Sequence, residues 1–320
     1  MDTNSVKNIL VGILIIFALV LGGLIIANEQ RFILSASQEN SIRILMERSG
    51  INFTDYANIT RDFRPRRQLV MHRYEFDLES IAYRFFEDEP FEKTESNSMI
   101  EFESETRRIT YSIDENSLLF EIEPGYTSPE FLATGHNNAS SELLANQYIE
   151  TLLGRQIDMK LHTTILTSRG DYVLNYFGSF RGYDIFNNHL RIRVTNHGIT
   201  RIRLSAFIAE DFSGEQMSIY SGDEAILALI NHLRETGVIS TLNISNALGR
   251  DMPRIEISSM HLFYYLEETR YGGARGQKAS PSYVFSVIIT NTVGNSTTSA
   301  RFNYIFNAYT NSFIRHELVQ

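Results

Sequence analysis

The sequence predicts an α+β protein in which a single N-terminal transmembrane helix is followed by antiparallel sheets, each packed with one or two helices. Three observations lead to this fold class. Residues 9–27 form an unbroken apolar run, helical patterns occur at three places after it, and several alternating apolar and polar segments follow the helical patterns. Because a doubly wound parallel sheet would need a helix between nearly every pair of strands, we expect antiparallel sheets.

The apolar run ILVGILIIFALVLGGLIIA contains no charged side chain. As a helix it would extend about 28 Å, which matches a hydrocarbon core of roughly 30 Å. A cleaved secretory signal would have a shorter apolar core and small residues before its cleavage site, whereas Ile25 stands two positions before Ala27. We therefore expect residues 9–27 to be an uncleaved transmembrane anchor.

The charges that flank the run do not decide its orientation, because Lys7 precedes it and several arginines follow it. The lengths of the two flanks are more informative. Residues 1–8 would form a short cytoplasmic tail, and the large region after the run would be translocated. We expect a single-pass type II protein of the cell membrane with extracytoplasmic C-terminal domains.

The region after the anchor is predicted to contain an acidic extracytoplasmic α+β domain over residues 28–135. A second extracytoplasmic α+β region, built from two helix-plus-strands units, would occupy residues 136–320. Pro129 and the polar stretch after it indicate the boundary. Residues 28–160 hold 24 acidic and 14 basic residues, whereas residues 161–320 hold 13 and 14. The acidic surplus of the first part argues against nucleic acid as a partner.

Helical patterns cover residues 38–49, residues 140–153 and the segment between Ser221 and Gly237. Ser35 and Gln38 have the spacing of a capping box before the first helix, as do Ser221 and Glu224 before the third. Gly50 and Gly237 stand where a helix commonly ends in a left-handed residue.

Strand patterns are recognised by apolar residues at every second position. Three of them, joined by turn residues such as Asp-Glu-Asn-Ser, form a predicted meander over residues 100–106, 108–113 and 117–123. The other predicted strands cover residues 159–166, 171–180, 189–195, 199–207, 255–268, 282–290 and 300–309.

The hairpin around Asn196, His197 and Gly198 is predicted to have a definite register. A three-residue loop, with Gly198 in the left-handed region, keeps aliphatic residues opposite aliphatic ones. The predicted pairs are Arg193 with Arg201, Ile192 with Ile202, Arg191 with Arg203, and Leu190 with Leu204.

This register places four arginines on one sheet face. Like charges directly opposite each other cost up to about 1 kcal/mol per pair, so we expect carboxylates within about 4 Å of at least two of the arginines. The acids would belong either to a partner or to this chain, and a solvated arginine face is the alternative. The candidates within the chain are the acidic row Glu101, Glu103, Glu105, Glu121 and Glu123.

Small residues recur within the apolar run at a spacing of four. Ala18 and Gly22 form one such pair, and Gly23 and Ala27 form another. Small residues at this spacing let two helices approach closely in lipid. They are therefore candidates for helix packing in the membrane, although small residues also occur in spans by chance.

The known catalytic patterns are missing from the sequence. It contains no H-E-x-x-H, G-x-S-x-G, Walker or EF-hand pattern, and it has no cysteine. His189 and His197 lie at opposite ends of a predicted strand, too far apart to bind one metal ion. We therefore expect no enzymatic activity, no metal site and no cofactor.

Arginines also cluster around Pro65, at positions 61, 64, 66 and 67. Such a cluster can contact lipid headgroups or an acidic partner. A solvated basic loop is the alternative interpretation.

Several strings, taken in order with the N-terminal apolar run, resemble one known family. They are YVLNYFGSFRGYDIFNNHLRIRVTNHGITRIRLSAF at 172–207, SGDEAILALINHL at 221–233, Pro281-Ser-Tyr283, and FNYIFNAYTNSF at 302–313. Together they resemble the YycI group of the YycH/YycI regulators, which are extracytoplasmic accessory proteins of the WalK (YycG) sensor histidine kinase of Gram-positive bacteria. Asn311 stands where this family commonly has a turn glycine, and asparagine tolerates the left-handed conformation.

The resemblance implies a non-enzymatic regulator in a two-component system. Its implied partners are a WalK-type sensor kinase, contacted through the span, and a paired YycH-like regulator, contacted through the exterior domains. Two alternatives remain open from the residues themselves. One is an extracytoplasmic ligand-sensing module, and the other is an enzyme that acts on cell-wall glycan with a glutamate pair from the acidic meander.

Overall fold

The computed structural model describes residues 31–123, 136–153, 159–167, 169–239, 253–267, 276–293 and 296–319. The fold is α+β, and the strand pairing is mostly antiparallel. The chain divides into two compact units, each assembled from segments far apart in the sequence. Unit 1 contains the described residues within 1–66, 215–262 and 281–320, and unit 2 contains those within 67–214 and 263–280.

Unit 2 is built on eight antiparallel strands in the order β7-β8-β9-β10-β6-β5-β4-β3. The first half of this sheet consists of β7 (Met159–Leu166), β8 (Tyr172–Phe180), β9 (Tyr183–Thr195) and β10 (Gly198–Ser205). The second half consists of β6 (Ser117–Ile122), β5 (Arg107–Ser112), β4 (Met99–Glu103) and β3 (Glu92–Glu95).

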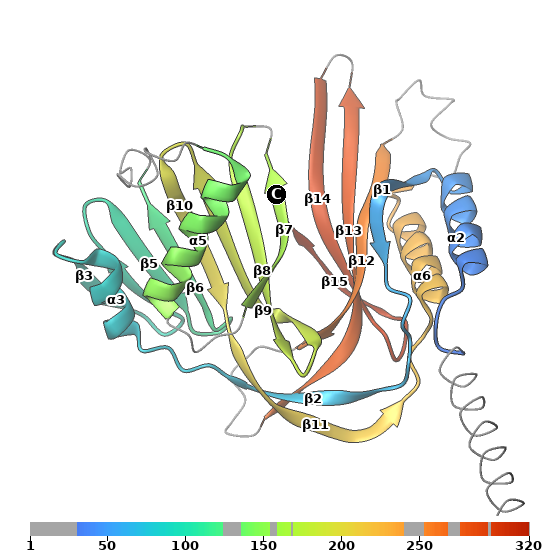
Figure 1. Cartoon of the computed structure of the whole chain (residues 1–320), viewed down its shortest axis with the longest axis horizontal. Helices are drawn as coiled ribbons and strands as arrows, with labels where there is room; N and C mark the ends of the chain where they lie inside the picture. The colour runs from blue at the N-terminus through green and yellow to red at the C-terminus, as the bar shows by residue number, and fades with distance from the viewer. Residues whose placement is uncertain are drawn as a thin grey trace, which may run out of the picture. The chain divides into compact units, whose positions relative to one another are not determined.

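Two helices, α3 (Leu78–Phe86) and α5 (Asn138–Leu153), lie over one face of this sheet (Figure 1). The core between them is aliphatic and aromatic, because the strands alternate and direct every second residue towards the helices. Phe85, Phe86 and Leu144 of the helices pack with Phe120 and Ile192 of the strands. The opposite face of these strands therefore carries the polar residues.

The chain enters and leaves unit 2 through β2 (Arg66–Arg73) and β11 (Phe207–Met217). The first residues of β13 (Gln277–Val293) pair with β2, where Gln277 is opposite Met71. A small second core around Leu69, Ile185 and Tyr264 supports this part of the unit.

The strand order of unit 1 is β1-β12-β13-β14-β15. These strands are β1 (Ile51–Ile59), β12 (Arg254–Tyr265), β13 (Gln277–Val293), β14 (Ser296–Asn307) and β15 (Phe313–Leu318), with β12 and β13 continuing into unit 2. Helices α2 (Ala36–Arg48) and α6 (Gly222–Glu235) lie side by side against the sheet (Figure 1). Their apolar stripes join the core of unit 1, which includes Met46, Leu229, Phe285 and Phe306.

The predicted helix signals are confirmed. Ser35 accepts a hydrogen bond from the backbone N–H of Gln38 at 3.3 Å, which completes the first capping box, and the second capping box at Ser221 is also present. Gly50 and Gly237 have φ values of 74° each. Asn311 has a φ of 56°, as expected for a residue that replaces a turn glycine.

Several features of the fold differ from the prediction. The helix α3 and the strands β1, β2, β3 and β15 were not predicted, and β1 runs parallel to β12 rather than antiparallel. The division into units also differs from the predicted boundary between residues 135 and 136, since β6, before that boundary, pairs with β10, after it. These pairings are between segments distant in sequence, which local periodicity does not report.

The predicted span over residues 9–27 lies outside the described residues. Among the helices that the structure describes, none is both long enough and apolar enough to cross a bilayer.

Candidate functional site

The arginine hairpin has the predicted register. Arg193 lies opposite Arg201, and Arg191 lies opposite Arg203. Ile192 and Ile202 also face each other, and both are buried on the helix-covered side of the sheet. The prediction that the four arginines share one face is therefore confirmed.

The loop itself is shorter than predicted. Thr195 pairs with Gly198, so the loop has two residues, Asn196 and His197, and the extra residue is accommodated as a bulge at Thr200. Gly198 has a positive φ of 108°, which favours glycine. A bulge satisfies the same requirement as a longer loop, because either one restores the aliphatic residues of β10 to the buried face.

The arginines extend into a row of charges that crosses five strands. Directly opposite residues on successive strands are Glu103 of β4, Arg108 of β5, Glu121 of β6, Arg201 of β10 and Arg193 of β9. Opposite residues in an antiparallel sheet point to the same face. We call these five residues the charge row. Its signs alternate except at the last step, where Arg201 meets Arg193. Beyond its other end, Glu92 of β3 lies opposite Glu103, which is a second pair of like charges.

Carboxylates of the chain itself contact Arg193, Arg201 and Arg203. Asp171 accepts hydrogen bonds from Arg193 at 3.0 Å (Nε) and 2.5 Å (Nη2). Arg201 lies 3.3 Å from Glu121, and Arg203 lies 3.0 Å from Glu115. The expected carboxylates are therefore present.

The fourth hairpin arginine, Arg191, donates from Nε to the side-chain oxygen of Asn175 at 3.0 Å. A neutral amide on β8 is thus one of its partners.

The predicted acidic row divides between two sets of arginines. Glu121 pairs with Arg201, whereas Glu101 and Glu103 both bind Arg108, with 3.2 Å between Arg108 Nε and Glu101. The hydrogen bond with Glu103, followed by the charges of Glu103, Glu101 and Glu121, raises the pKa of the Arg108 guanidinium. Glu105 and Glu123 are exposed beyond the ends of their strands.

A shallow groove of about 420 Å³ lies along the end of the charge row. Its walls contain four glutamates and four arginines, and Thr200 of the bulge also lines it. The charged lining residues are Glu103, Glu105, Glu121, Glu123, Arg107, Arg108, Arg193 and Arg201. With equal numbers of both signs, this groove suits a partner surface that also carries both signs.

His189 stands two residues before Arg191 on β9. Burial, followed by the nearby charges of Arg191 and Arg203, lowers the pKa of its imidazole to about 3. The ring is therefore neutral at physiological pH. It adds no positive charge next to the four hairpin arginines.

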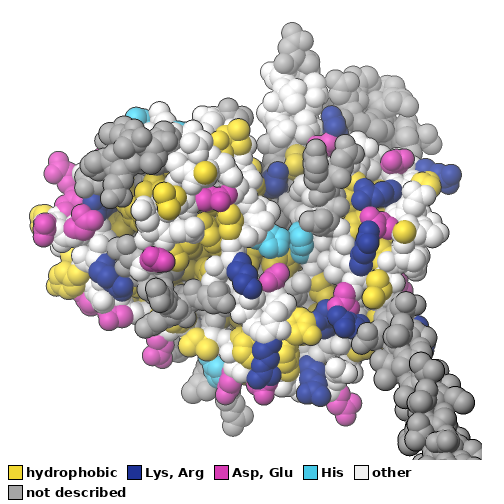
Figure 2. Space-filling model, in the orientation of Figure 1, with side chains coloured by type: hydrophobic (Ala, Val, Ile, Leu, Met, Phe, Trp, Pro, Cys, Tyr) yellow, Lys and Arg dark blue, Asp and Glu magenta, His cyan; other side chains and the backbone are white. Residues whose placement is uncertain are grey.

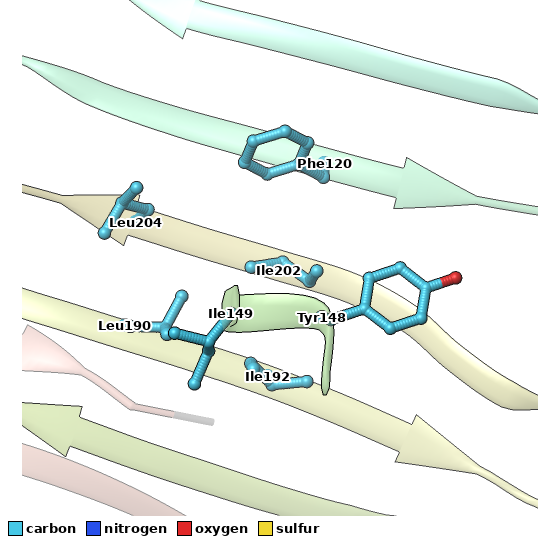
Figure 3. Close-up of a pocket in the computed structure, with 7 residues that line it drawn as sticks. All are labelled: Phe120, Tyr148, Ile149, Leu190, Ile192, Ile202 and Leu204. Carbon is cyan, nitrogen blue, oxygen red and sulfur yellow. The ribbon is translucent and has the colours of Figure 1, made fainter. Parts of the chain in front are cut away.

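A second, apolar cavity lies beneath α5 (Figure 3). Tyr148 and Ile149 of the helix cover it, and the other residues that line it come from β6, β9 and β10. Its volume is about 10 Å³, which is near the smallest space that holds one water molecule, and no polar atom lines it. We interpret it as a packing void.

Other candidates from the sequence have no counterpart in the described part of the chain. Ala18, Gly22, Gly23 and Ala27 lie outside it. Within the described residues, no three His, Asp or Glu side chains are grouped so that they could hold a metal ion.

Lys, Arg, Asp and Glu side chains are interspersed over the surface shown in Figure 2.

Sequence reasoning missed three members of this surface, namely Arg108, Glu115 and Asp171. Arg108 could have been found by counting outward from the turn after β5, because Ser112 pairs with Ser117 and Arg108 therefore faces Glu121. Glu115 lies in a turn, where no strand period indicates the direction of a side chain. Asp171 directly precedes β8, so its contact with Arg193 depends on how β8 pairs with β9.

Comparison with known proteins finds a solved structure of similar fold and no matching family. No family model matches the sequence, and no curated protein matches it. A crystal structure of an uncharacterized protein from Eubacterium rectale is similar, with a TM-score of 0.50 and 14% identity, over 83% of this chain and 90% of that one. This likeness is one of fold alone.

Two further structures have lower scores. YycH from Bacillus subtilis has a TM-score of 0.38 and 10% identity, over 76% of this chain and 55% of that one. The YpeB C-terminal domain from Bacillus megaterium has a TM-score of 0.31 and 10% identity, over 78% and 99%. At these scores neither carries an inference about this chain.

Proposed function

We propose that this protein is a membrane-anchored, extracytoplasmic accessory regulator of a WalK-type sensor histidine kinase. It acts by protein–protein contacts and not by catalysis. The span over residues 9–27 contacts the kinase, and the charge row contacts a paired YycH-like regulator. The sequence resemblance over residues 172–313 supports the class of partner, and the charge row supports the mode of contact.

The charge row is suited to contact because its guanidinium groups are both ordered and accessible. The side chain of Arg193 is 33% exposed and that of Arg201 is 55% exposed, while Asp171 and Glu121 hold them in place. An arginine that is already oriented loses less conformational entropy when a partner binds. Alternating charges also select the register of a partner, because a shifted partner would place like charges together.

Swapping the two residues of one ion pair tests this role while the ion pair itself is kept. The double variant Arg201→Glu/Glu121→Arg keeps an intrachain pair and one like-charge step in the row, but it changes the order of signs. We expect the folded state to be retained and partner binding to weaken by about tenfold, with a smaller difference at high salt. A two-hybrid assay and a titration of the purified regulator both measure this binding.

A matched exchange elsewhere in unit 2 provides the control. Arg181 and Asp211 form a 3.0 Å pair whose side chains are 61% and 63% exposed. The variant Arg181→Asp/Asp211→Arg should bind the partner like the parent protein. Equal binding by the Arg201/Glu121 exchange, or equal loss in both exchanges, would exclude the charge row as the contact.

The span is tested separately with Gly22→Leu and Gly23→Leu. A leucine at either position would hold two helix backbones apart and should weaken association with the kinase. Ile15→Leu, which leaves the small residues in place, is the control. Unchanged association in both glycine variants would contradict helix packing through these residues.

A further inference from the structure

The N-terminal segment of unit 1 forms a short ladder with the segment after β1. Ile33 pairs with Asp62, Leu34 donates its N–H to the carbonyl of Arg61 at 2.9 Å, and Phe63 donates to the carbonyl of Phe32 at 3.0 Å. The rings of Phe32 and Phe63 meet edge to face at 6.0 Å. Buried Leu34 fixes the ladder to the core of unit 1.

Arginines outnumber carboxylates around this ladder. Glu39 accepts hydrogen bonds from Arg43 at 3.2 Å and from Arg61 at 2.7 Å. Asp62 accepts from Arg64 at 2.7 Å and from Arg66 at 3.1 Å. Four guanidinium groups thus share two carboxylates, which leaves two excess positive charges.

Other charges nearby change this excess only in part. Exposed Arg31 adds a positive charge at the start of the ladder. Asp223 and Glu224 lie in the first turn of α6, next to Gly222, whose Cβ position would be 3.1 Å from the carbonyl of Thr60. Ser221 donates hydrogen bonds to both of these acids. Among these described residues one positive charge remains, and Glu29 stands two positions before Arg31 in the sequence.

The two carboxylates that pair with these arginines, Glu39 and Asp62, are firmly ionised. Burial alone would raise the pKa of Glu39, but hydrogen bonds from Arg43 and Arg61 outweigh it and lower the pKa. The pKa of Asp62 is lowered in the same way, with Arg64 as the hydrogen-bond donor. These carboxylates hold the arginines in fixed positions.

The most exposed groups of the ladder combine an apolar and a basic character. Ile33 is 49% exposed, and the side chains of Arg61 and Arg64 are 60% and 55% exposed. A guanidinium has five N–H donors, and the ion pair of Arg61 with Glu39 uses one nitrogen of Arg61, so its other donors can meet a phosphate. Apolar and arginine side chains together are typical of a surface that lies in the headgroup region of a bilayer.

The position of the ladder in the sequence identifies the bilayer as its occupant. The apolar run ends at Ala27, four residues before Arg31, and four residues extend at most about 14 Å. We propose that the ladder of residues 31–34 and 61–64 lies on the membrane surface, where Arg61 and Arg64 bind the phosphates of anionic phospholipid headgroups. This inference rests on the anchor of the proposed function.

The absence of cysteine from the sequence allows a direct test on the full chain. A fluorophore is attached at Ile33→Cys, or at Glu47→Cys as the reference, and the protein is inserted into phosphatidylcholine vesicles with or without phosphatidylglycerol. Lipids that carry a quencher near the headgroup report contact. Residue 47 is in the last turn of α2, whose 13 residues place it about 20 Å from the ladder.

We expect quenching at residue 33 to exceed that at residue 47, and to increase with phosphatidylglycerol. Arg61→Gln/Arg64→Gln should remove the increase, because the loss of each arginine should lower the equilibrium constant for membrane contact about fivefold. Arg61→Lys/Arg64→Lys should retain part of it, because the charge remains while bidentate binding is lost.

Arg48→Gln/Arg254→Gln is the matched control. Arg48 is near the end of α2, and Arg254 precedes Ile255, which pairs with Ile51 at the same end of the unit. This variant removes the same charge away from the ladder and should leave quenching unchanged. Thermal unfolding of each variant shows whether the fold is retained.

The outcomes separate this inference from the anchor on which it rests. A chain that does not float with the vesicles has no inserted span, which overturns both proposals. Two results with a floating chain would overturn the headgroup contact alone. One is no quenching at residue 33, and the other is the same quenching in the parent and in Arg61→Gln/Arg64→Gln. Protection of residue 33 only after an acidic partner protein is added would assign the ladder to that protein and overturn the lipid contact.

Discussion

Deletion of Thr200 tests whether burial of alternate residues sets the register of the β9–β10 hairpin. Thr200 is the extra residue between two regular parts of the β9–β10 hairpin, which end at the pair Val194–Ile199 and resume at Arg193–Arg201. Without it, Ile199 still faces the core, Arg201 still faces outward, and every pair on both sides is retained. We expect a change of less than about 1 kcal/mol in the free energy of unfolding, because a bulge contributes no cross-strand pair.

Deletion of Arg203, three residues further along the same strand, should have a very different result. The register is regular from Arg201 to Ser205, so Ile202 and Leu204 would become neighbours and could not both face the core. Ile202 is 3% exposed and Leu204 is fully buried. Exposing one aliphatic side chain costs about 1.5–3 kcal/mol, and turning Arg201 inward adds an unpaired charge, so we expect a loss of at least about 3 kcal/mol.

Urea unfolding followed by circular dichroism compares the two deletions with the parent chain in the same detergent. The loss expected from the Arg203 deletion is a large part of the 5–15 kcal/mol typical of a folded domain. The loss of the exposed Arg203–Glu115 pair explains no more than about 1 kcal/mol of it. If the two deletions destabilise the protein equally, the inference that burial of alternate residues sets this register is refuted.

Two further predictions concern buried polar groups of unit 2. Since the pKa of His189 is lowered in the folded state, only the unfolded state binds a proton to this ring below about pH 6.5, and the free energy of unfolding should decrease as the pH falls. At pH 5 the loss amounts to about 2 kcal/mol. His189→Gln should remove this loss from a series of urea unfolding curves measured at different pH values. An equal slope between pH 7 and pH 5 in that variant would exclude His189 as the cause. Asn188 hydrogen-bonds both the N–H and the carbonyl of Phe207, at 2.5 and 2.8 Å, so Asn188→Ala should cost about 3 kcal/mol because two backbone groups lose their partners. A change of melting temperature below about 2 °C would show that water or a rearranged loop replaces the amide.

Local signals of the sequence were sufficient for the helix ends and for one hairpin. The capping residues Ser35 and Ser221 depend on interactions within four residues, so they could be read without knowledge of the fold. The α3 helix was missed although Asp77 caps it, since its hydrophobic pattern covers only nine residues. The β1 strand was missed as well, and its parallel pairing with β12 joins residues about 200 positions apart.

The candidate site shows the same division between local and distant information. The sequence by itself determined that Arg191, Arg193, Arg201 and Arg203 share a face, because their alternation with buried aliphatic residues permits one register only. It also predicted carboxylates near such a face, with a solvated face as the alternative. Which carboxylates supply the charge was decided by the tertiary structure, since Glu121 reaches Arg201 only through the pairing of β6 with β10. That pairing depends on the packing of a common core under α3 and α5, and a core formed by distant segments has no signature in a local sequence period.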